Sequence, residues 1–151
     1  MDSNKKLEIL ERPAVQSHIS MLQGVINKMS GNCANCKSWT VTLVAAMMIL
    51  LVDKDTKIPN AWICLIPVGL FFFLDCYYLA LERMCIAAQK KFLADIETGG
   101  YINSLYKIGG ISGFWLRLYN TVKAIGSFST IPFYLIVAIV VLFFGGIIGG
   151  Q

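Results

Sequence analysis

One acidic side chain, Asp75, lies inside a stretch of apolar and aromatic residues that is long enough to cross a membrane. A carboxylate at the centre of a bilayer costs on the order of 3 kcal/mol, and less near the interface, so it needs a partner or a function. In an antiparallel hairpin with the preceding apolar run, Lys37, Trp39 and Thr40 lie level with Asp75 and can donate hydrogen bonds to it. Three roles stay open: a latch between helices, which we favour, an acid in a water-lined ion path, and an acid facing lipid headgroups.

Glu82 follows Asp75 by two helical turns, and Arg83 stands next to it in the sequence. Two turns place both carboxylates on one helical face but about 10 Å apart along the axis. That separation is too large for the two acids to share a proton or to hold one small metal ion. We interpret Glu82 and Arg83 as the group that positions the helix where it leaves the membrane.

Thiols and a histidine are the other side chains that could carry chemistry. Cys33 and Cys36 have the CxxC spacing, but neither a second CxxC nor a pair of histidines accompanies them, so helix packing is the favoured role. His18 is the only histidine and is expected at a surface or an interface. Phosphate-binding loops, nucleophile elbows and zinc signatures are missing from the sequence. We therefore expect no enzymatic activity, no metal and no cofactor.

The composition places these residues in a membrane protein. Of 151 residues, 56% are hydrophobic and only 15% are charged. Soluble domains contain about 45–50% apolar and about 25% charged residues. The excess is gathered in runs, which favours a bilayer over a large dry core. We predict an all-α integral membrane protein with three transmembrane helices, an N-terminal amphipathic helix and an interfacial helix.

The spans are delimited by their lengths and by the polar segments between them. The first apolar run, Trp39 to Val52, gives only about 21 Å of helix, whereas a hydrocarbon core is about 30 Å thick, so the span must begin near Cys33. The predicted units are the cytoplasmic N-terminal helix 1–31, the hairpin 33–81 with spans 33–52 and 61–81, the cytoplasmic helix extension and interfacial segment 82–128, and the third transmembrane helix 131–150.

The N-terminal helix is expected to be separate, because Gly31-Asn32 is typical of a break or a bend. Its apolar residues recur every three or four positions and form one stripe. The stripe can pack on the membrane surface, on another part of the chain or on a second copy, and its basic-poor polar face favours protein. Close approach between copies is also possible at glycines spaced four apart near the C-terminus. The candidates for self-association are Val15, Ile19, Leu22, Ile26, Met29, Gly145, Gly146 and Gly149.

The second span is expected to continue into the cytoplasm to about Glu97, where Gly99-Gly100 ends it. Residues 101–128 then alternate glycines with aromatic and basic residues, which is typical of a helix at the membrane interface. Ser129 and Thr130 can cap the third span, and Pro132 suits its first turn.

The distribution of basic residues predicts the orientation. Of the 13 lysines and arginines, five lie in residues 1–38 and six in 82–130, whereas the C-terminal tail has none. By the positive-inside rule, the N-terminus and 82–130 are cytoplasmic, and the C-terminus is periplasmic or extracellular. Basic residues spread beside a membrane indicate contacts with anionic lipid headgroups and not with nucleic acid.

Four segments in order resemble a family of small bacterial three-span membrane proteins, mostly uncharacterised, some of which lie in anti-phage defence gene neighbourhoods. The segments are Met21–Met29, Lys37–Ala46, Leu74–Leu79 with Glu82-Arg83, and Ser129–Tyr134. The motif positions of the family correspond to Asn32, Lys37, Trp39, Asp75, Tyr78, Glu82 and Arg83. Cys33 stands where a serine is expected, which further weakens a thiol role. The resemblance implies no settled activity.

Two functions of different classes remain. The first is an oligomeric effector of the bacterial inner membrane that forms a pore or depolarises the membrane, triggered through a cytosolic sensor or operon partner. The second is a non-catalytic anchor or scaffold that holds a cytosolic partner at the membrane. We favour the effector, largely because of the resemblance.

Overall fold

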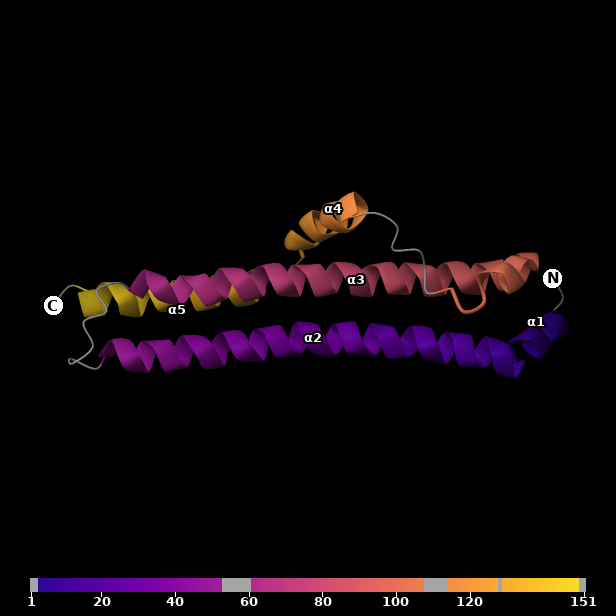
Figure 1. The fold of residues 1–151 in the computed structure, drawn as a ribbon, viewed down its shortest axis with the longest axis horizontal. Coiled ribbons are helices and arrows are strands. Elements are labelled where there is room, and N and C mark those ends of the chain that lie inside the picture. Colours follow the sequence, from indigo (N-terminus) through magenta and orange to yellow (C-terminus); the bar gives the residue numbers. More distant parts are fainter. Residues whose placement is uncertain (1–2, 53–60, 108–113, 128, 150–151) are drawn as a thin grey trace.

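The computed structural model describes residues 3–52, 61–107, 114–127 and 129–149, and the regular structure in these ranges is helical. Two long helices, α2 (Pro13–Val52) and α3 (Leu65–Thr98), run antiparallel and side by side along the length of the molecule (Figure 1). The shorter helices are arranged around this pair. They are α1 (Ser3–Leu10), α4 (Phe114–Ile125) and α5 (Ile131–Gly149), with 3₁₀ turns at Ala61–Cys64 and Gly100–Ser104.

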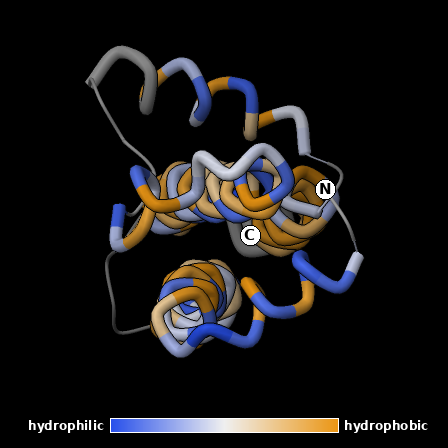
Figure 2. The backbone as a smooth tube through the Cα atoms, turned by 90° about the vertical axis from the view of Figure 1, so that its right-hand side faces the viewer, coloured by the Kyte–Doolittle hydropathy of each residue, from blue (hydrophilic) through white to orange (hydrophobic). Residues whose placement is uncertain are grey.

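The short helices occupy different parts of the pair. α1 lies at the end formed by the start of α2 and the end of α3, whereas α5 lies along the opposite end (Figure 1). α4 rests on the middle of α3, on the side away from α2, as the view along the long axis also shows (Figure 2). Ala124 of α4 is buried against Cys76 and Ala80 of α3. The predicted helix in 101–128 is therefore confirmed at Phe114–Ile125, and its position at a membrane interface stays a prediction.

α2 contacts α3 along a seam whose fully buried side chains recur every three or four residues in two groups, 15–22 and 33–44, with half-buried Ile26 and Met29 between the groups. This is the spacing by which paired helices keep one face toward each other over many turns. The seam joins the apolar stretch of α2 to its more polar beginning without interruption. Its buried members on α2 are Val15, His18, Leu22, Cys33, Cys36, Thr40 and Val44.

The predicted break at Gly31-Asn32 is wrong, because α2 is one helix of 40 residues. A glycine inside a helix costs about 1 kcal/mol relative to alanine. Gly31 lies on the exposed side, and burial of Leu22 before it and of Cys33 after it offsets that cost. Residues 1–31 are therefore not a separate unit from the hairpin.

The apolar stripe of the predicted N-terminal helix packs on another part of its own chain, which is one of the three partners left open for it. Val15 and Leu22 are fully buried, and Val15 forms a cluster with Phe92 and Ile96 of α3. Burial within one chain leaves these two side chains unavailable to a second copy, so the predicted role in self-association is wrong for them. Ile19, Ile26 and Met29 are half-buried on the same helix. The packing of Gly145, Gly146 and Gly149 lies outside the described residues.

The expected continuation of the second apolar stretch is confirmed. α3 runs without a break to Thr98, and Gly99 ends it in the left-handed conformation with φ 81°. The N–H of Gly99 donates to the carbonyl of Ile96 over 3.3 Å. Pro67 lies in the first turn of α3, where the backbone N–H groups have no partner within a helix.

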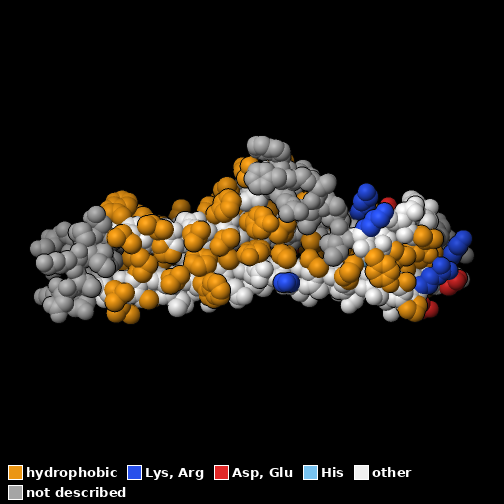
Figure 3. Space-filling view, in the orientation of Figure 1, with side chains coloured by type: hydrophobic (Ala, Val, Ile, Leu, Met, Phe, Trp, Pro, Cys, Tyr) orange, Lys and Arg blue, Asp and Glu red, His pale blue; other side chains and the backbone are white. Residues whose placement is uncertain are grey.

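Two stretches of helix, Pro13–Leu50 and Trp62–Thr98, are long and apolar enough to cross a membrane. The described apolar part of α5, Ile131–Phe144, is shorter. Exposed hydrophobic side chains cover one half of the molecule, and charged side chains gather at the other end (Figure 3). We call residues 33–50, 62–81 and 131–144 the apolar half, and residues 3–32 and 82–107 the polar half.

The tip of the polar half is held together by side chains that link α1 to α3 and to the turn after it. Lys6 pairs with Glu97. Arg12 donates from Nη1 to the Tyr101 hydroxyl over 3.0 Å. Ile9 of α1 packs into the same cluster as Tyr101. These contacts close the ends of α2 and α3 against each other.

Candidate functional site

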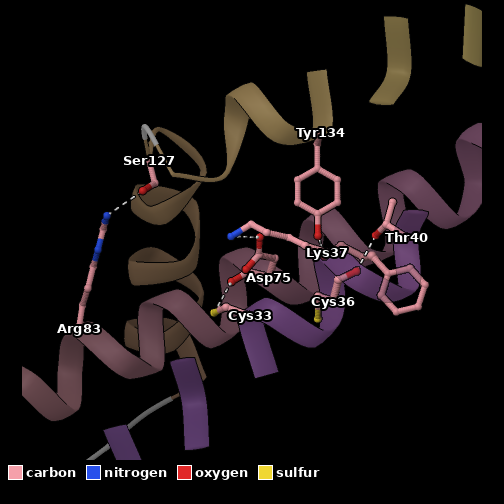
Figure 4. Close-up of polar contacts among 9 residues, drawn as sticks. Cys33, Cys36, Lys37, Thr40, Asp75, Arg83, Ser127 and Tyr134 are labelled. Atoms are coloured by element: carbon pink, nitrogen blue, oxygen red, sulfur yellow. Dashed lines mark hydrogen bonds and ion pairs between the residues drawn. The ribbon is translucent and has the colours of Figure 1, made fainter. Parts of the chain in front are cut away.

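A charge pair joins the two long helices in the apolar half. Asp75 of α3 is 1% exposed, and Nζ of Lys37 on α2 lies 3.3 Å from its Oδ2 (Figure 4). The side chain of Lys37 is 26% exposed. Lys37 is therefore confirmed as the partner of Asp75.

The other two predicted donors do not reach Asp75. Trp39 is 60% exposed, and its ring meets Phe71 edge-on at 6.2 Å between centroids. It stands two residues after Lys37, which turns it to another side of α2. The Thr40 hydroxyl donates to the carbonyl of Cys36 over 2.7 Å, so it satisfies itself within its own helix. The prediction was wrong for both residues.

The carboxylate of Asp75 is held by charge attraction alone. Neither of its oxygens accepts a hydrogen bond from the part of the chain that the structure describes, and the contact with Lys37 is close but not aligned as a hydrogen bond. Buried carboxylates ordinarily accept hydrogen bonds as well as facing a positive charge, because both offset the loss of hydration. Asp75 thus retains capacity for further donors.

The side chains around the pair attach α2 and α5 to α3. Cys33 lies on α2 with its Sγ 3.7 Å from the backbone oxygen of Asp75. Cys36 packs in an apolar cluster with Phe71 of α3 and Tyr134 of α5. The Tyr134 hydroxyl donates to the carbonyl of Phe71 over 3.1 Å. Both thiols of the CxxC segment are buried in helix contacts and unpaired, in agreement with the predicted packing role.

Arg83 and Glu82 mark the passage from the apolar to the polar half. Arg83 donates from Nη2 to Oγ of Ser127 over 3.0 Å, so it ties α3 to the connection between α4 and α5 (Figure 4). Glu82 is half-buried and forms no ion pair with the described residues. Arg83 therefore links α3 to the residues before α5, and the role of this pair where the helix leaves a membrane stays a prediction.

Two buried polar residues at the start of α5 also lie in this region. The sequence did not identify them as site residues. Tyr134 anchors α5, and Thr130, at the residue before α5, is 0% exposed. The oxygen Oγ1 of Thr130 has no hydrogen-bond partner among the described residues, so the predicted side-chain cap by Thr130 does not form. The sequence Ser-Thr-Ile-Pro at 129–132 is typical of a helix start. It does not predict that this start packs against α3.

His18 lies in the polar half, in an interface within the chain. It is 1% exposed, and its Nδ1 accepts a hydrogen bond from the N–H of Tyr106 over 3.0 Å. Its ring lies 4.3 Å from that of Phe92 between centroids. Tyr106 adopts a left-handed conformation with φ 59°, which is uncommon for a bulky residue, and its bond to His18 holds it there. Burial lowers the pKa of His18.

No protein-family model, no curated protein and no solved structure matches this chain. The resemblance to the small three-span family stays a prediction, and the functional argument rests on the geometry above. In the apolar half, the chemically distinctive feature of that geometry is the Lys37–Asp75 pair. Two opposite charges can stay paired between helices, or they can separate if water reaches them.

Proposed function

We propose that this chain is a small bacterial inner-membrane protein that acts as an oligomeric effector, breaching or depolarising the membrane when it is triggered. In this proposal residues 33–52, 61–81 and 131–149 are three spans, and the polar half is cytoplasmic. The observation that carries the proposal is the Lys37–Asp75 pair, which lies between two helices in the apolar half and has few other polar contacts.

The pair is an expensive way to hold two helices together. Replacing a buried ion pair by well-packed apolar residues is often neutral or stabilising, because both charges must lose hydration. Within a bilayer, ionisable residues are default candidates for a functional site. A pair of charges supplies what an apolar contact lacks, namely a second state in which the charges separate and are hydrated.

A conducting path would have to lie between copies of the chain. Val44, Val68 and Val141, one from each helix of the apolar half, pack in one cluster. The groove of about 550 Å³ between α2 and α5 is lined by apolar side chains and offers ions no polar contact. The proposal therefore requires a homo-oligomer. Since Val15 and Leu22 are used within the chain, contacts between copies are assigned to the spans, where Gly145, Gly146 and Gly149 remain candidates.

The continuity of α2 and α3 supports a trigger on the cytoplasmic side. Each helix runs without a break from the polar half to the charge pair. A cytosolic sensor or operon partner that moves the polar half therefore moves Lys37 and Asp75 with it. The resemblance to a family with members in defence neighbourhoods suggests phage infection as the trigger.

The length of the polar half favours one second candidate, a membrane anchor. Residues 13–32 extend α2 by about 30 Å beyond the apolar half, which is a large platform for a soluble partner. An anchor needs the platform but has no use for a charge pair that can separate. This difference makes Lys37 and Asp75 the residues on which to test the two candidates.

The test compares membrane leakage for the wild type, Asp75→Asn, and the double variant Lys37→Met/Asp75→Leu. Each purified protein is reconstituted in liposomes at increasing protein-to-lipid ratios, and the decay of an imposed membrane potential is followed with a dye. For the effector we expect leakage that rises steeply with protein density, a changed leakage for Asp75→Asn, and little leakage for the apolar double variant.

Lys28→Met is the matched control, because Lys28 is an exposed lysine of the same helix in the polar half. It should leak as the wild type does. Sealed liposomes at every density, together with sealed cells when any operon partner is co-expressed and triggered, would contradict the effector. Copurification of that partner in a fixed ratio would then favour the anchor.

A further inference from the structure

Three side-chain oxygens are buried without a hydrogen-bond partner in the part of the chain that the structure describes: Oδ1 and Oδ2 of Asp75, and Oγ1 of Thr130. Asp75 is 1% exposed and Thr130 is 0% exposed. A buried polar atom without a partner loses the hydrogen bonds that it made to water, at a cost of about 1–3 kcal/mol. Such atoms are rare in native proteins, and an internal water molecule is one common reason for them.

Helical spacing predicts that the two residues lie at the same level of α3 and α5. Phe71 and Asp75 are four residues apart on one face of α3, and Thr130 and Tyr134 are four residues apart at the start of α5. The Tyr134 hydroxyl donates to the carbonyl of Phe71 over 3.1 Å. Since α5 runs antiparallel to α3 (Figure 1), one turn back along α5 is one turn forward along α3. This step brings Thr130 to the level of Asp75.

The charges of Lys37 and Asp75 restrict which ion or molecule can form hydrogen bonds with the unpartnered oxygens of Asp75 and Thr130. A cation would be repelled by Lys37, whose Nζ lies 3.3 Å from Asp75 Oδ2, and an anion would be repelled by Asp75. The occupant must donate to a carboxylate and exchange a hydrogen bond with a hydroxyl, which both donates and accepts. A water molecule has this capacity, and internal waters make about three hydrogen bonds.

We propose that Asp75 and Thr130 form a binding site for an internal water molecule, next to Lys37 and between α3 and α5. The water donates to a carboxylate oxygen of Asp75 and shares a hydrogen bond with the Thr130 hydroxyl. The water thereby gives Asp75 the hydrogen bond that Lys37 does not form, because the ammonium group of Lys37 is not aligned for one. The site is independent of the proposed effector function, since an anchor with the same fold would hold the same water.

The first test measures stability in detergent for Thr130→Val, which removes the hydroxyl and keeps the shape. If a water bridges the two residues, the unfolding equilibrium should shift about 5-fold toward the unfolded state, the effect of one lost hydrogen bond. If the site is dry, removing an unpartnered hydroxyl should stabilise the protein, and that result would overturn the proposal. Thr42→Val is the control, because the Thr42 hydroxyl donates to the carbonyl of Ser38 within its own helix over 3.0 Å. It should stay near the wild type.

The second test observes the water directly. Solid-state NMR of threonine-labelled protein in liposomes measures how fast magnetisation passes from water to each threonine. We expect early transfer to Thr130 and none to Thr40, which is equally buried. Destabilisation by Thr130→Val without transfer from water would indicate a direct contact between Thr130 and Asp75 and would also overturn the proposal.

Discussion

The charge of Asp75 is balanced by one lysine whose own side chain is 26% exposed. This unequal burial decides what each partner tolerates. The carboxylate has no route to solvent, whereas a lysine can turn its long stem and bring its ammonium group toward a more polar region. Loss of Lys37 therefore leaves a buried charge without compensation, and loss of the Asp75 charge leaves a charge that can relocate.

We expect Lys37→Met to destabilise the fold more than Asp75→Asn does. Removing one partner of a fully buried ion pair costs about 3–5 kcal/mol, so about 3 kcal/mol is expected for Lys37→Met and about 1–2 kcal/mol for Asp75→Asn. Lys37→Met/Asp75→Leu should return to within about 1 kcal/mol of the wild type, because no charge remains to be buried. Equilibrium unfolding in detergent checks all three. Equal losses for the two single variants would contradict the unequal burial.

His18 predicts a loss of stability in mild acid. Burial lowers its pKa in the folded protein from the ordinary 6.5, and its Nδ1 must be unprotonated to accept the Tyr106 N–H. As the pH falls below about 6.5, the unfolded chain binds a proton that the folded chain excludes, so stability decreases. The melting temperature should therefore fall between pH 7.5 and 5.5.

The variant His18→Gln is the control for this pH effect, because glutamine keeps an acceptor and does not titrate. Its melting temperature should change less over the same interval. Lys6 lowers the pKa of Glu97, so this carboxylate stays charged throughout the interval and does not contribute. His18 is the only histidine of the chain, and a pH dependence that persists in the variant would contradict the assignment.

The pairing of Lys37 with Asp75 could be predicted because an antiparallel hairpin fixes which residues share a level. The contacts of Trp39, Thr40 and Tyr134 could not. They depend on the rotation of each helix about its axis, and a short apolar run with hydrophobic residues on all sides carries no signal of that rotation. The bond between His18 and Tyr106 joins segments far apart in the sequence, and no local pattern predicts it.

At the scale of elements, one continuous helix links the polar and apolar halves. α2 keeps its seam against α3 on both sides of Gly31, and the Cβ that an alanine would add there meets nothing within 4 Å. The expected break was inferred from local preference alone. The signal that opposes it was in the sequence: the apolar spacing of Val15 and Leu22 continues in phase through Cys33, Cys36 and Val44. When the buried positions on both sides of a glycine fall on the same helical face, the pattern indicates one continuous helix packed against one partner.

Two glycine substitutions should have opposite effects. Gly31→Ala should stabilise the protein by about 0.5–1 kcal/mol, because alanine restricts the unfolded chain and fits the helix. Gly99→Ala should destabilise it by about 1 kcal/mol or more, because Gly99 has φ 81° where a side chain is strained. Thermal unfolding of both variants in the same detergent checks the pair. Destabilisation by Gly31→Ala would indicate that α2 bends at that residue after all.

At the scale of the whole molecule, the hairpin is longer than a bilayer is thick. The 40 residues of α2 span about 60 Å, twice the roughly 30 Å of a hydrocarbon core. The apolar half accounts for one bilayer thickness, and the polar half, closed by Lys6–Glu97 and Arg12–Tyr101, for the rest. The proposed arrangement therefore has a rigid stalk of about 30 Å on the cytoplasmic side.

Single cysteines placed on exposed positions of α2 test this arrangement. Gln23 is exposed in the polar half and Ala45 is exposed in the apolar half, while all five native cysteines are buried. A membrane-impermeant maleimide should label Gln23→Cys in inverted vesicles and not in right-side-out vesicles. Ala45→Cys should resist labelling from both sides, and both should react after solubilisation.

Labelling of Gln23→Cys only in right-side-out vesicles would reverse the proposed orientation. Labelling of Ala45→Cys in intact vesicles would contradict its place inside the bilayer.

The charge pair also determines how α2 and α3 can move past each other. A seam of small and aliphatic side chains repeats itself every seven residues, so a slide by one repeat keeps most contacts. After such a slide Asp75 would face the level of Ser30 or Val44 and lose its counter-charge. A buried polar contact of this kind selects one register among several that are otherwise similar. We therefore expect relative motion of the two helices to be all-or-none, between a single aligned register and states in which the charges have parted.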